Sequence, residues 1–196
     1  YLFTETIIRY GNEDIKKDIL PKLVSGEIVG TLAVTEDFLA PTSSNIKTEV
    51  SNNKIIGKKI AVPDAGIATH SIIVCKSLNG IDLRLIDLSD KSVSISSQDT
   101  VDDSRGHFCI ELDNTPSLLV GDENNGWELY ESIINQAAVL FSFEQVGGSQ
   151  ATLDMAVNYA KQRYAFGKPI GSFQGVKHKL ADMYVAITLA KSNSYY

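Results

Sequence analysis

The chain has 196 residues, a net charge of −6 at pH 7, 43% hydrophobic residues and 21% charged residues. This composition is that of a soluble globular protein, and the acidic balance argues against a nucleic-acid-binding surface, which needs a basic excess. No apolar run approaches the roughly 20 residues that span a bilayer. The two cysteines, Cys75 and Cys109, lie in separate strand-like runs. We therefore predict buried structural thiols and a cytoplasmic location, because isolated thiols fit a reducing compartment.

The first 26 residues are predicted to form two helical segments. The first ends near Gly11. Asn12 is a predicted N-cap of the second, because its side chain can accept from free amides and the acidic residues Glu13 and Asp14 suit a helix N-terminus. Ser25 and Gly26 are expected to end it.

The hydrophobic period changes from helical to strand-like after residue 26. Strands are predicted over 28–35, 47–50, 54–62, 71–76, 81–87, 91–95 and 107–112. Asn52-Asn53 and Asn79-Gly80 lie where hairpin turns are needed, and Asn-Gly favours a type I′ turn. Many short strands with short connections predict an antiparallel β barrel or sandwich, so the fold class is α+β.

The C-terminal part is predicted to be a long helix, a turn and a second helix. Apolar residues recur at helical spacing from about 125 to 164. Gly167 and Pro169 are expected to stop this helix, and Ser172 is a predicted N-cap of a second helix that packs antiparallel to the first.

The turn between these helices carries a cation, two aromatic rings and an amide in Arg163, Phe166, Phe173 and Gln174. Such a set could bind a flat anionic ligand, for example a nucleotide cofactor. The alternative is that Arg163 only caps the C-terminal end of its helix. His70, His107 and His178 have no partner at ligand spacing, so we predict no metal site.

The order R-x-x-F-G-x-P-I-x-x-F-Q-x-x-K-H-x-L-A-D-M, from Arg163 to Met183, resembles the acyl-CoA dehydrogenases. These flavoproteins desaturate acyl thioesters between the α and β carbons. The resemblance implies the end of an N-terminal helical domain (1–26), a middle β domain (27–121) and the first helices of a C-terminal helical domain (122–196). Because the chain lacks an initial Met and covers about half of a family chain, we expect a fragment.

The resemblance also implies FAD as the cofactor, held between the β domain and the C-terminal helices with help from a neighbouring subunit. It places Val34 and Thr35 at the flavin pyrimidine. It places Arg163, Phe166 and Gln174 at the adenosine and pyrophosphate of an FAD that the partner subunit mainly binds. For Val34 and Thr35 the alternative is an ordinary strand end, because Thr-Glu is a common ending.

Two segments depart from the family pattern. Where the family usually has Pro-Gly-x-Gly-Ser-Asp, this chain has residues 37–42, Asp-Phe-Leu-Ala-Pro-Thr. The glycines are gone, and Thr42 could still offer a hydroxyl. Where family members commonly place Trp-Ile-Thr against the flavin, the chain has Ala61, Val62 and Pro63. Pro63 has no N–H to donate, so Thr42, Ala61 and Pro63 stand at degraded flavin positions.

The catalytic carboxylate is expected outside this chain. Most members carry it on a later helix, and a minority carry it near the position of Ala138, which is an alanine here. Glu144 is the candidate within the chain, because it lies in an apolar stretch where burial would raise its pKa. It lies nearly two turns from the expected position.

Two functions follow from the resemblance. The first is an FAD-dependent acyl-CoA dehydrogenase subunit that takes acyl-CoA, passes electrons to electron-transfer flavoprotein and assembles as a homo- or hetero-oligomer of family subunits. The alternative is a non-catalytic partner subunit that lends Arg163, Phe166 and Gln174 to the FAD of a companion chain. An acyl-CoA oxidase or a flavin monooxygenase on the same scaffold stays open, and so does the acyl chain length.

Overall fold

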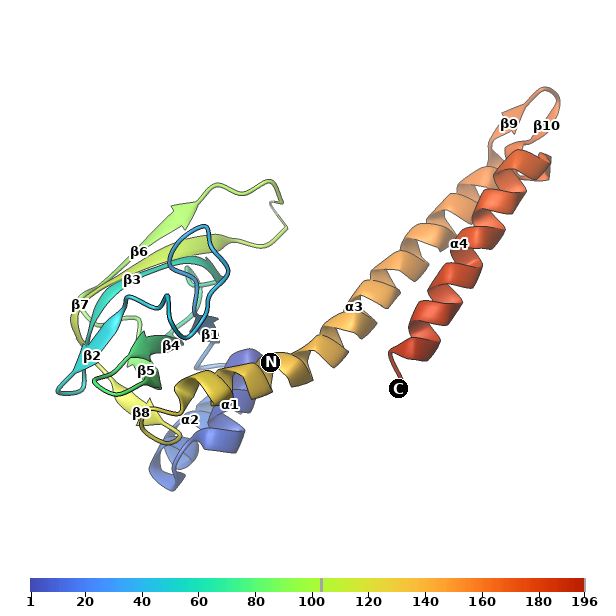
Figure 1. The fold of residues 1–196 in the computed structure, drawn as a ribbon. Helices are drawn as coiled ribbons and strands as arrows, with labels where there is room; N and C mark the ends of the chain where they lie inside the picture. Colours follow the sequence, from blue (N-terminus) through green and yellow to red (C-terminus); the bar gives the residue numbers. More distant parts are fainter. Residues whose placement is uncertain (103, 196) are drawn as a thin grey trace. The chain divides into compact units, whose positions relative to one another are not determined.

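The computed structural model describes residues 1–102 and 104–195, which form two compact units (Figure 1). The first unit comprises Tyr1–Ile134, and the second begins at Asn135. The first unit opens with helices α1 (Leu2–Tyr10) and α2 (Glu13–Ser25). The predicted N-cap is confirmed, because the Asn12 side chain accepts a hydrogen bond from the amide of Ile15 at 2.8 Å.

An eight-stranded sheet follows the two helices. The strands that were predicted from the sequence are present, with shifted ends, and Leu118–Val120 adds a strand that the sequence did not indicate. Their bounds are β1 Gly30–Ala33, β2 Glu49–Ser51, β3 Lys54–Pro63, β4 His70–Lys76, β5 Ile81–Asp87, β6 Val93–Gln98, β7 His107–Pro116 and β8 Leu118–Val120.

The predicted α+β class is confirmed, but the all-antiparallel arrangement expected for a barrel or sandwich is wrong, because the sheet is mixed and does not close into a barrel. Its order is β6-β7-β3-β2-β4-β5-β8, with β1 also paired to β4. Strand β1 runs parallel to β4, with Gly30 opposite His70, and β2 runs parallel to β4 where Glu49 lies opposite Lys76. Hairpins such as β4–β5 are antiparallel because a short turn reverses the chain. The pairing of β1 with β4 joins segments forty residues apart, which local turns do not specify.

The sheet has a buried core on each face. Strand β4 shows this most directly, because Ile72 and Val74 pack into one core and Ile73 and Cys75 into the other. The first core is covered by α1 and α2 through Phe3, Ile7, Ile15 and Ile19. Alternate residues of a strand point to opposite faces, so a strand buried on both faces reads as a continuous apolar run. Both cysteines are free and buried, and burial raises the pKa of Cys75 to about 12.

One of the two predicted hairpin turns has left-handed geometry, and the other differs from the prediction. Asn52 and Asn53 have the positive φ angles, 50° and 59°, that a type I′ turn requires. Asn79 and Gly80 have no positive φ, and the β4–β5 connection is closed instead by the amide of Ser77 donating to the carbonyl of Gly80 at 2.8 Å. The longer four-residue connection removes the need for a left-handed turn.

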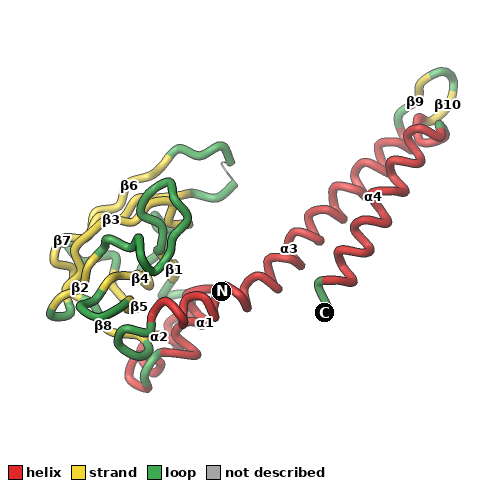
Figure 2. Tube along the Cα trace, in the orientation of Figure 1, coloured by secondary structure: helices red, strands yellow, loops and turns green. Residues whose placement is uncertain are grey.

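The second unit contains most of helix α3 (Gly126–Gln162), a hairpin of β9 (Tyr164–Ala165) and β10 (Lys168–Pro169), the 3₁₀ turn η1 (Ile170–Ser172) and helix α4 (Gln174–Asn193) (Figure 2). The helices are antiparallel, as predicted. A Cβ on Gly171, just before α4, would lie 3.0 Å from the carbonyl oxygen of Ala160, near the end of α3. At the other end, the rings of Phe143 and Tyr195 lie 4.8 Å apart.

Ser172 is not the N-cap of α4, in contrast to the prediction. It lies inside η1, where its hydroxyl donates to the carbonyl of Pro169 at 2.7 Å. Phe173 occupies the N-cap position without a capping side chain. The 3₁₀ turn therefore uses the hydroxyl that would otherwise satisfy a helix amide. Within the described residues, no helix is long and apolar enough to cross a membrane, and no group of three His, Cys, Asp or Glu residues could hold a metal ion.

Candidate functional site

The hairpin between α3 and α4 holds an aromatic residue in an unfavourable backbone conformation. Phe166 and Gly167 are the two central residues of the β9–β10 turn, with φ angles of 52° and 79°. Glycine tolerates this region, but a bulky residue enters it only at a cost of about 1–2 kcal/mol. The Phe166 ring is also 95% exposed, so burial does not offset this strain. A strained and exposed aromatic residue indicates a role in binding.

The segment that contains this ring also carries two exposed polar side chains that make no hydrogen bond within the described chain, Arg163 and Gln174. Arg163 is exposed, and within residues 1–102 and 104–195 no acceptor pairs with its guanidinium. The backbone of Arg163 is fixed, because its carbonyl accepts from the amide of Ile170 at 2.8 Å. The exposed Gln174 begins α4. The backbone thus holds in place a planar cation and an amide that are free to bind an anionic partner.

The aromatic rings of the turn contact one another and a second cation. The Phe166 and Phe173 rings meet edge to face, with centroids 6.2 Å apart. The Lys168 ammonium lies 4.5 Å from the centroid of Phe173. An ammonium over a ring face is attracted by the ring quadrupole, which holds the Lys168 side chain of the hairpin against Phe173. The turn therefore presents positive charge beside flat apolar surface.

The second candidate set lies in the first unit, at the end of β1. The carbonyl of Val34 accepts a hydrogen bond from the Lys59 ammonium at 3.0 Å, and the carbonyl of Thr35 accepts from the amide of Ile60 at 2.8 Å. The Thr35 hydroxyl makes no hydrogen bond within the described part of the chain and is partly exposed. That hydroxyl is therefore available to a ligand, while the backbone beneath it is fixed.

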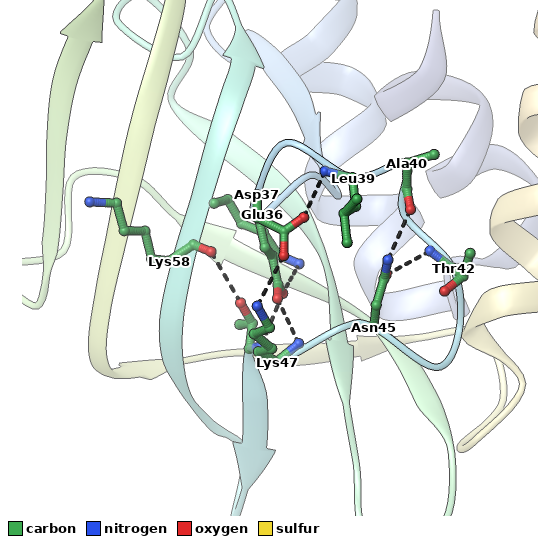
Figure 3. Close-up of polar contacts among 10 residues, drawn as sticks. Glu36, Asp37, Leu39, Ala40, Thr42, Asn45, Lys47 and Lys58 are labelled. Atoms are coloured by element: carbon green, nitrogen blue, oxygen red, sulfur yellow. Dashed lines mark hydrogen bonds and ion pairs between the residues drawn. The ribbon is translucent and has the colours of Figure 1, made fainter.

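The loop after β1 is closed by a carboxylate, as Figure 3 shows. Glu36 accepts from the amides of Lys47 and Thr48 at 2.6 and 2.9 Å and from the Lys59 ammonium at 2.6 Å. Burial acts to raise the pKa of Glu36, but the hydrogen bond and charge of Lys59, with the Thr48 donors, outweigh it and hold this pKa below its ordinary value. The loop is thus held at both ends by one ionised side chain.

The degraded flavin positions have their polar groups engaged within the chain. The Thr42 amide donates to Asn45 Oδ1 at 2.8 Å (Figure 3). The Thr42 hydroxyl lies 3.0 Å from the Ser44 hydroxyl. The amide of Ala61 donates to Gln98 Oε1 at 2.6 Å. These internal bonds leave little at either position that a cofactor could use.

Pro63 is engaged in the same way, because its carbonyl accepts from the Thr31 hydroxyl at 2.7 Å. Ala61 also has a φ of 51°, which places the strand in a left-handed kink at a β-bulge of β3. The kink turns the exposed alanine away from the strand's regular alternation. A methyl group there gives little surface for a flavin ring to pack on.

The carboxylate candidate Glu144 is exposed on α3 within the second unit. The burial that would make it a base is therefore not supplied by this chain. Ala138 is the position where a minority of family members carry the catalytic carboxylate. Its side chain is a methyl group, and its carbonyl accepts from the Ser142 hydroxyl at 2.7 Å. Glu36 is a buried carboxylate beside the Val34–Thr35 set, but its oxygens already accept from the Lys59 ammonium and from the amides of Lys47 and Thr48.

Sequence reasoning missed Lys59 and Gln98. Lys59 is completely buried in β3, four residues from the buried Ile55 and therefore on the same face of the strand. A lysine at an inward-facing position is a signal that could have identified it, since lysine is almost never fully buried unless paired. Gln98 gave no local signal, because its partner lies 37 residues away.

Comparisons with known proteins identify the family. The model of the acyl-CoA dehydrogenase C-terminal domain matches residues 124–196. An acyl-CoA dehydrogenase of Bacillus subtilis (strain 168) is 28% identical over 207 residues, which cover 98% of this chain and 55% of that protein. Mitochondrial isovaleryl-CoA dehydrogenase of Oryza sativa subsp. japonica is 30% identical over 203 residues, which cover 96% of this chain and 50% of that protein.

Among solved structures, an acyl-CoA dehydrogenase complexed with FAD from Bacillus anthracis has a TM-score of 0.93 at 23% identity, covering 99% of this chain and 35% of that one. That likeness shows the fold. The chain spans about half the length of the curated relatives it matches. From the family-model match and the agreement of relatives over nearly the whole chain, the chain belongs to the acyl-CoA dehydrogenase family.

Proposed function

We propose that the chain is part of an FAD-dependent acyl-CoA dehydrogenase subunit. The observation that carries this proposal is the hairpin of the second unit, where the strained, exposed Phe166 stands with the unpaired Arg163 and with Gln174. Such a dehydrogenase removes the α proton of an acyl-CoA with a carboxylate, and the flavin accepts hydride from the β carbon. The division into domains 1–26, 27–121 and 122–196 belongs to the same proposal.

The residues fit FAD in one unit and only in part in the other. Arg163, Phe166 and Gln174 would hold the adenosine and pyrophosphate portion, because a guanidinium pairs with phosphate oxygens at two points and the ring offers a stacking face. Val34 and Thr35 would hold the flavin pyrimidine, with the free Thr35 hydroxyl as the group that reaches the ligand. Thr42, Ala61 and Pro63 fit poorly, because their polar groups already bond inside the chain.

The catalytic base and the electron acceptor are proposed to come from outside these residues. The base would come from elsewhere in the full-length protein, because Glu144 is exposed and Ala138 has no titratable group. Electron-transfer flavoprotein is the proposed acceptor, and a homo- or hetero-oligomer of family subunits is the proposed assembly. A cytoplasmic location completes this proposal.

A second candidate function is a non-catalytic partner subunit. It is favoured by the internal use of the Ala61 amide, the Pro63 carbonyl and the Thr42 hydroxyl, which leaves the first unit few groups for its own flavin. The hairpin with Arg163 would then serve the FAD of a companion chain. The two functions use the same fold and differ in which chain mainly binds the cofactor.

The flavin absorption of the full-length protein, purified alone and with a co-expressed family subunit, tests both candidates. If the protein is an autonomous dehydrogenase, both Thr35→Val and Arg163→Ala lower its flavin content, and Lys191→Ala, which removes another cation of the second unit, leaves it unchanged. If it is a partner subunit, only Arg163→Ala lowers the flavin of the co-purified complex. Absence of flavin in every preparation would contradict both functions.

A further inference from the structure

Lys59 is a fully buried lysine that contacts the end of β1 and the loop that follows it. Its side chain is 0% exposed, and that of Glu36 is 7% exposed. The Lys59 ammonium donates to Glu36 Oε1 at 2.6 Å and to the carbonyl of Val34 at 3.0 Å. One charge inside β3 is therefore bonded both to the backbone of the proposed flavin edge and to the side chain that closes the next loop.

Glu36 transmits this contact across the loop of residues 37–46. Its two oxygens accept the amides of Lys47 and Thr48 at 2.6 and 2.9 Å, at the far end of the loop (Figure 3). The loop is also braced internally, because Asp37 accepts from the amide of Leu39 at 2.9 Å and from the Lys47 ammonium at 3.0 Å. Its start and its end are thus held together by the Glu36 carboxylate, which Lys59 pairs from inside, and by the Asp37–Lys47 pair.

The loop that is fixed in this way carries exposed apolar side chains. Phe38 is 103% exposed and Leu39 is 67% exposed, so packing does not hold them in place. Further along, the Asn45 side chain donates to the carbonyl of Ala40 at 2.9 Å, which closes a turn within the loop (Figure 3). Ile46, at the end of the loop, is its buried hydrophobic residue. Hydrogen bonds and charge set the shape of residues 37–45.

Stability alone does not account for the ion pair. Replacing a buried ion pair with well-packed apolar residues is often neutral or stabilising, because desolvation of two charges offsets their attraction. A methionine and an apolar partner would fill the same space inside β3. What apolar residues could not do is bond the Val34 carbonyl and the amides of Lys47 and Thr48 at once. The pair therefore contributes more to the positions of these backbone groups than to the free energy of unfolding.

We infer that Lys59 is a positioning residue, which acts through Glu36 and the Val34 carbonyl to hold the end of β1 and the 37–46 loop in one arrangement at the edge where flavin is proposed to bind. This inference rests on the proposed function for its ligand, but the ordering of the loop does not. Lys59 itself is fully buried and contacts the proposed flavin residue Val34 only through the Val34 backbone carbonyl. It orders the residues that do.

The test compares three variants of the full-length protein with the wild type by hydrogen exchange in the apoprotein and by flavin affinity. Lys59→Met keeps the length of the side chain and removes its charge. The double variant Glu36→Gln/Lys59→Met also removes the carboxylate charge that would be left buried. Arg84→Met is the matched control, because it breaks another buried ion pair, with Asp82 at 2.6 Å, on β5.

In Lys59→Met, amides of the peptide 37–48 should exchange about tenfold faster, the loss expected for a charge-assisted hydrogen bond. Amides of β4 should change less. The double variant should recover overall stability while the loop remains loosened, and flavin affinity should fall by about tenfold in both variants. Arg84→Met should speed exchange without singling out the loop.

The inference is overturned if the loop keeps its protection relative to β4 in Lys59→Met, or if Arg84→Met loosens the loop to the same extent. It is also overturned if the loop loosens and flavin affinity is unchanged. If the wild type binds no flavin, the proposed function fails. Loop exchange then decides separately whether Lys59 orders this edge.

Discussion

Breaking the buried pair of Asp82 and Arg84 from one side should strongly destabilise the first unit. The Asp82 side chain is 1% exposed and that of Arg84 is 8% exposed. Asp82 accepts from Arg84 through Nε at 3.1 Å and Nη2 at 2.6 Å, and from the amide of Asn124 at 2.8 Å. It therefore joins β5 to the segment that leads into α3.

Asp82→Ala would leave the Arg84 guanidinium buried with only Asn53 as a partner, whose Oδ1 accepts from Nη1 at 2.8 Å. It would also leave the Asn124 amide without its acceptor. Breaking a buried pair from one side typically costs about 3–5 kcal/mol, because an uncompensated charge remains. The separate hydrogen bonds would sum to more, but they are not additive since they share one carboxylate.

The assay is urea unfolding of the chain followed by fluorescence. Trp127 is the only tryptophan of the sequence, and it packs against the core that α1 and α2 cover. Its emission therefore reports on the unit that contains Asp82. Glu111→Ala is the control, because it breaks the Lys58–Glu111 pair, whose side chains are 55% and 56% exposed, and should leave the midpoint nearly unchanged.

The double variant Asp82→Asn/Arg84→Met separates charge from packing. Because no charge is left buried, it should be more stable than either single variant. A loss below about 1 kcal/mol in Asp82→Ala would refute the expectation that an unpaired Arg84 is costly at this site. A double variant as unstable as Asp82→Ala would show that packing, and not the unpaired charge, sets the loss.

Three further predictions concern the first unit. Gly30→Ala should lower the thermal midpoint strongly, because a Cβ there would lie 2.1 Å from the ring of Phe3, and Gly26→Ala, with no neighbour within 4 Å, should do so less. Cys75 should react with a thiol reagent only on unfolding, since burial raises its pKa to about 12 and keeps it protonated; rapid labelling of the folded protein would contradict this. Glu36 has a lowered pKa in the fold, so its contribution to stability is complete above its unfolded value of about 4.3 and is lost as the pH falls through the folded value. Acid titration of Glu36→Gln should show a weaker loss in that range.

The sequence by itself determined the features that neighbouring residues control. The Asn12 cap, the apolar run of β4 and the left-handed Asn52-Asn53 turn depend on contacts a few residues apart, and each was predicted. The ordered motif from Arg163 to Met183 also identified the family, because each of its residues has a fixed spacing along the chain.

The tertiary structure alone decided which distant segments meet. The parallel pairing of β1 with β4, the Ala61–Gln98 bond and the Lys59–Glu36 pair join residues 23 to 40 positions apart. No local propensity specifies such partners, because the choice depends on which faces are buried when the sheet packs. At Ser172 the local sequence also leaves the structure undecided, because the hydroxyl could cap a helix or close a 3₁₀ turn. The structure has the 3₁₀ turn, and there Gly171 packs against Ala160.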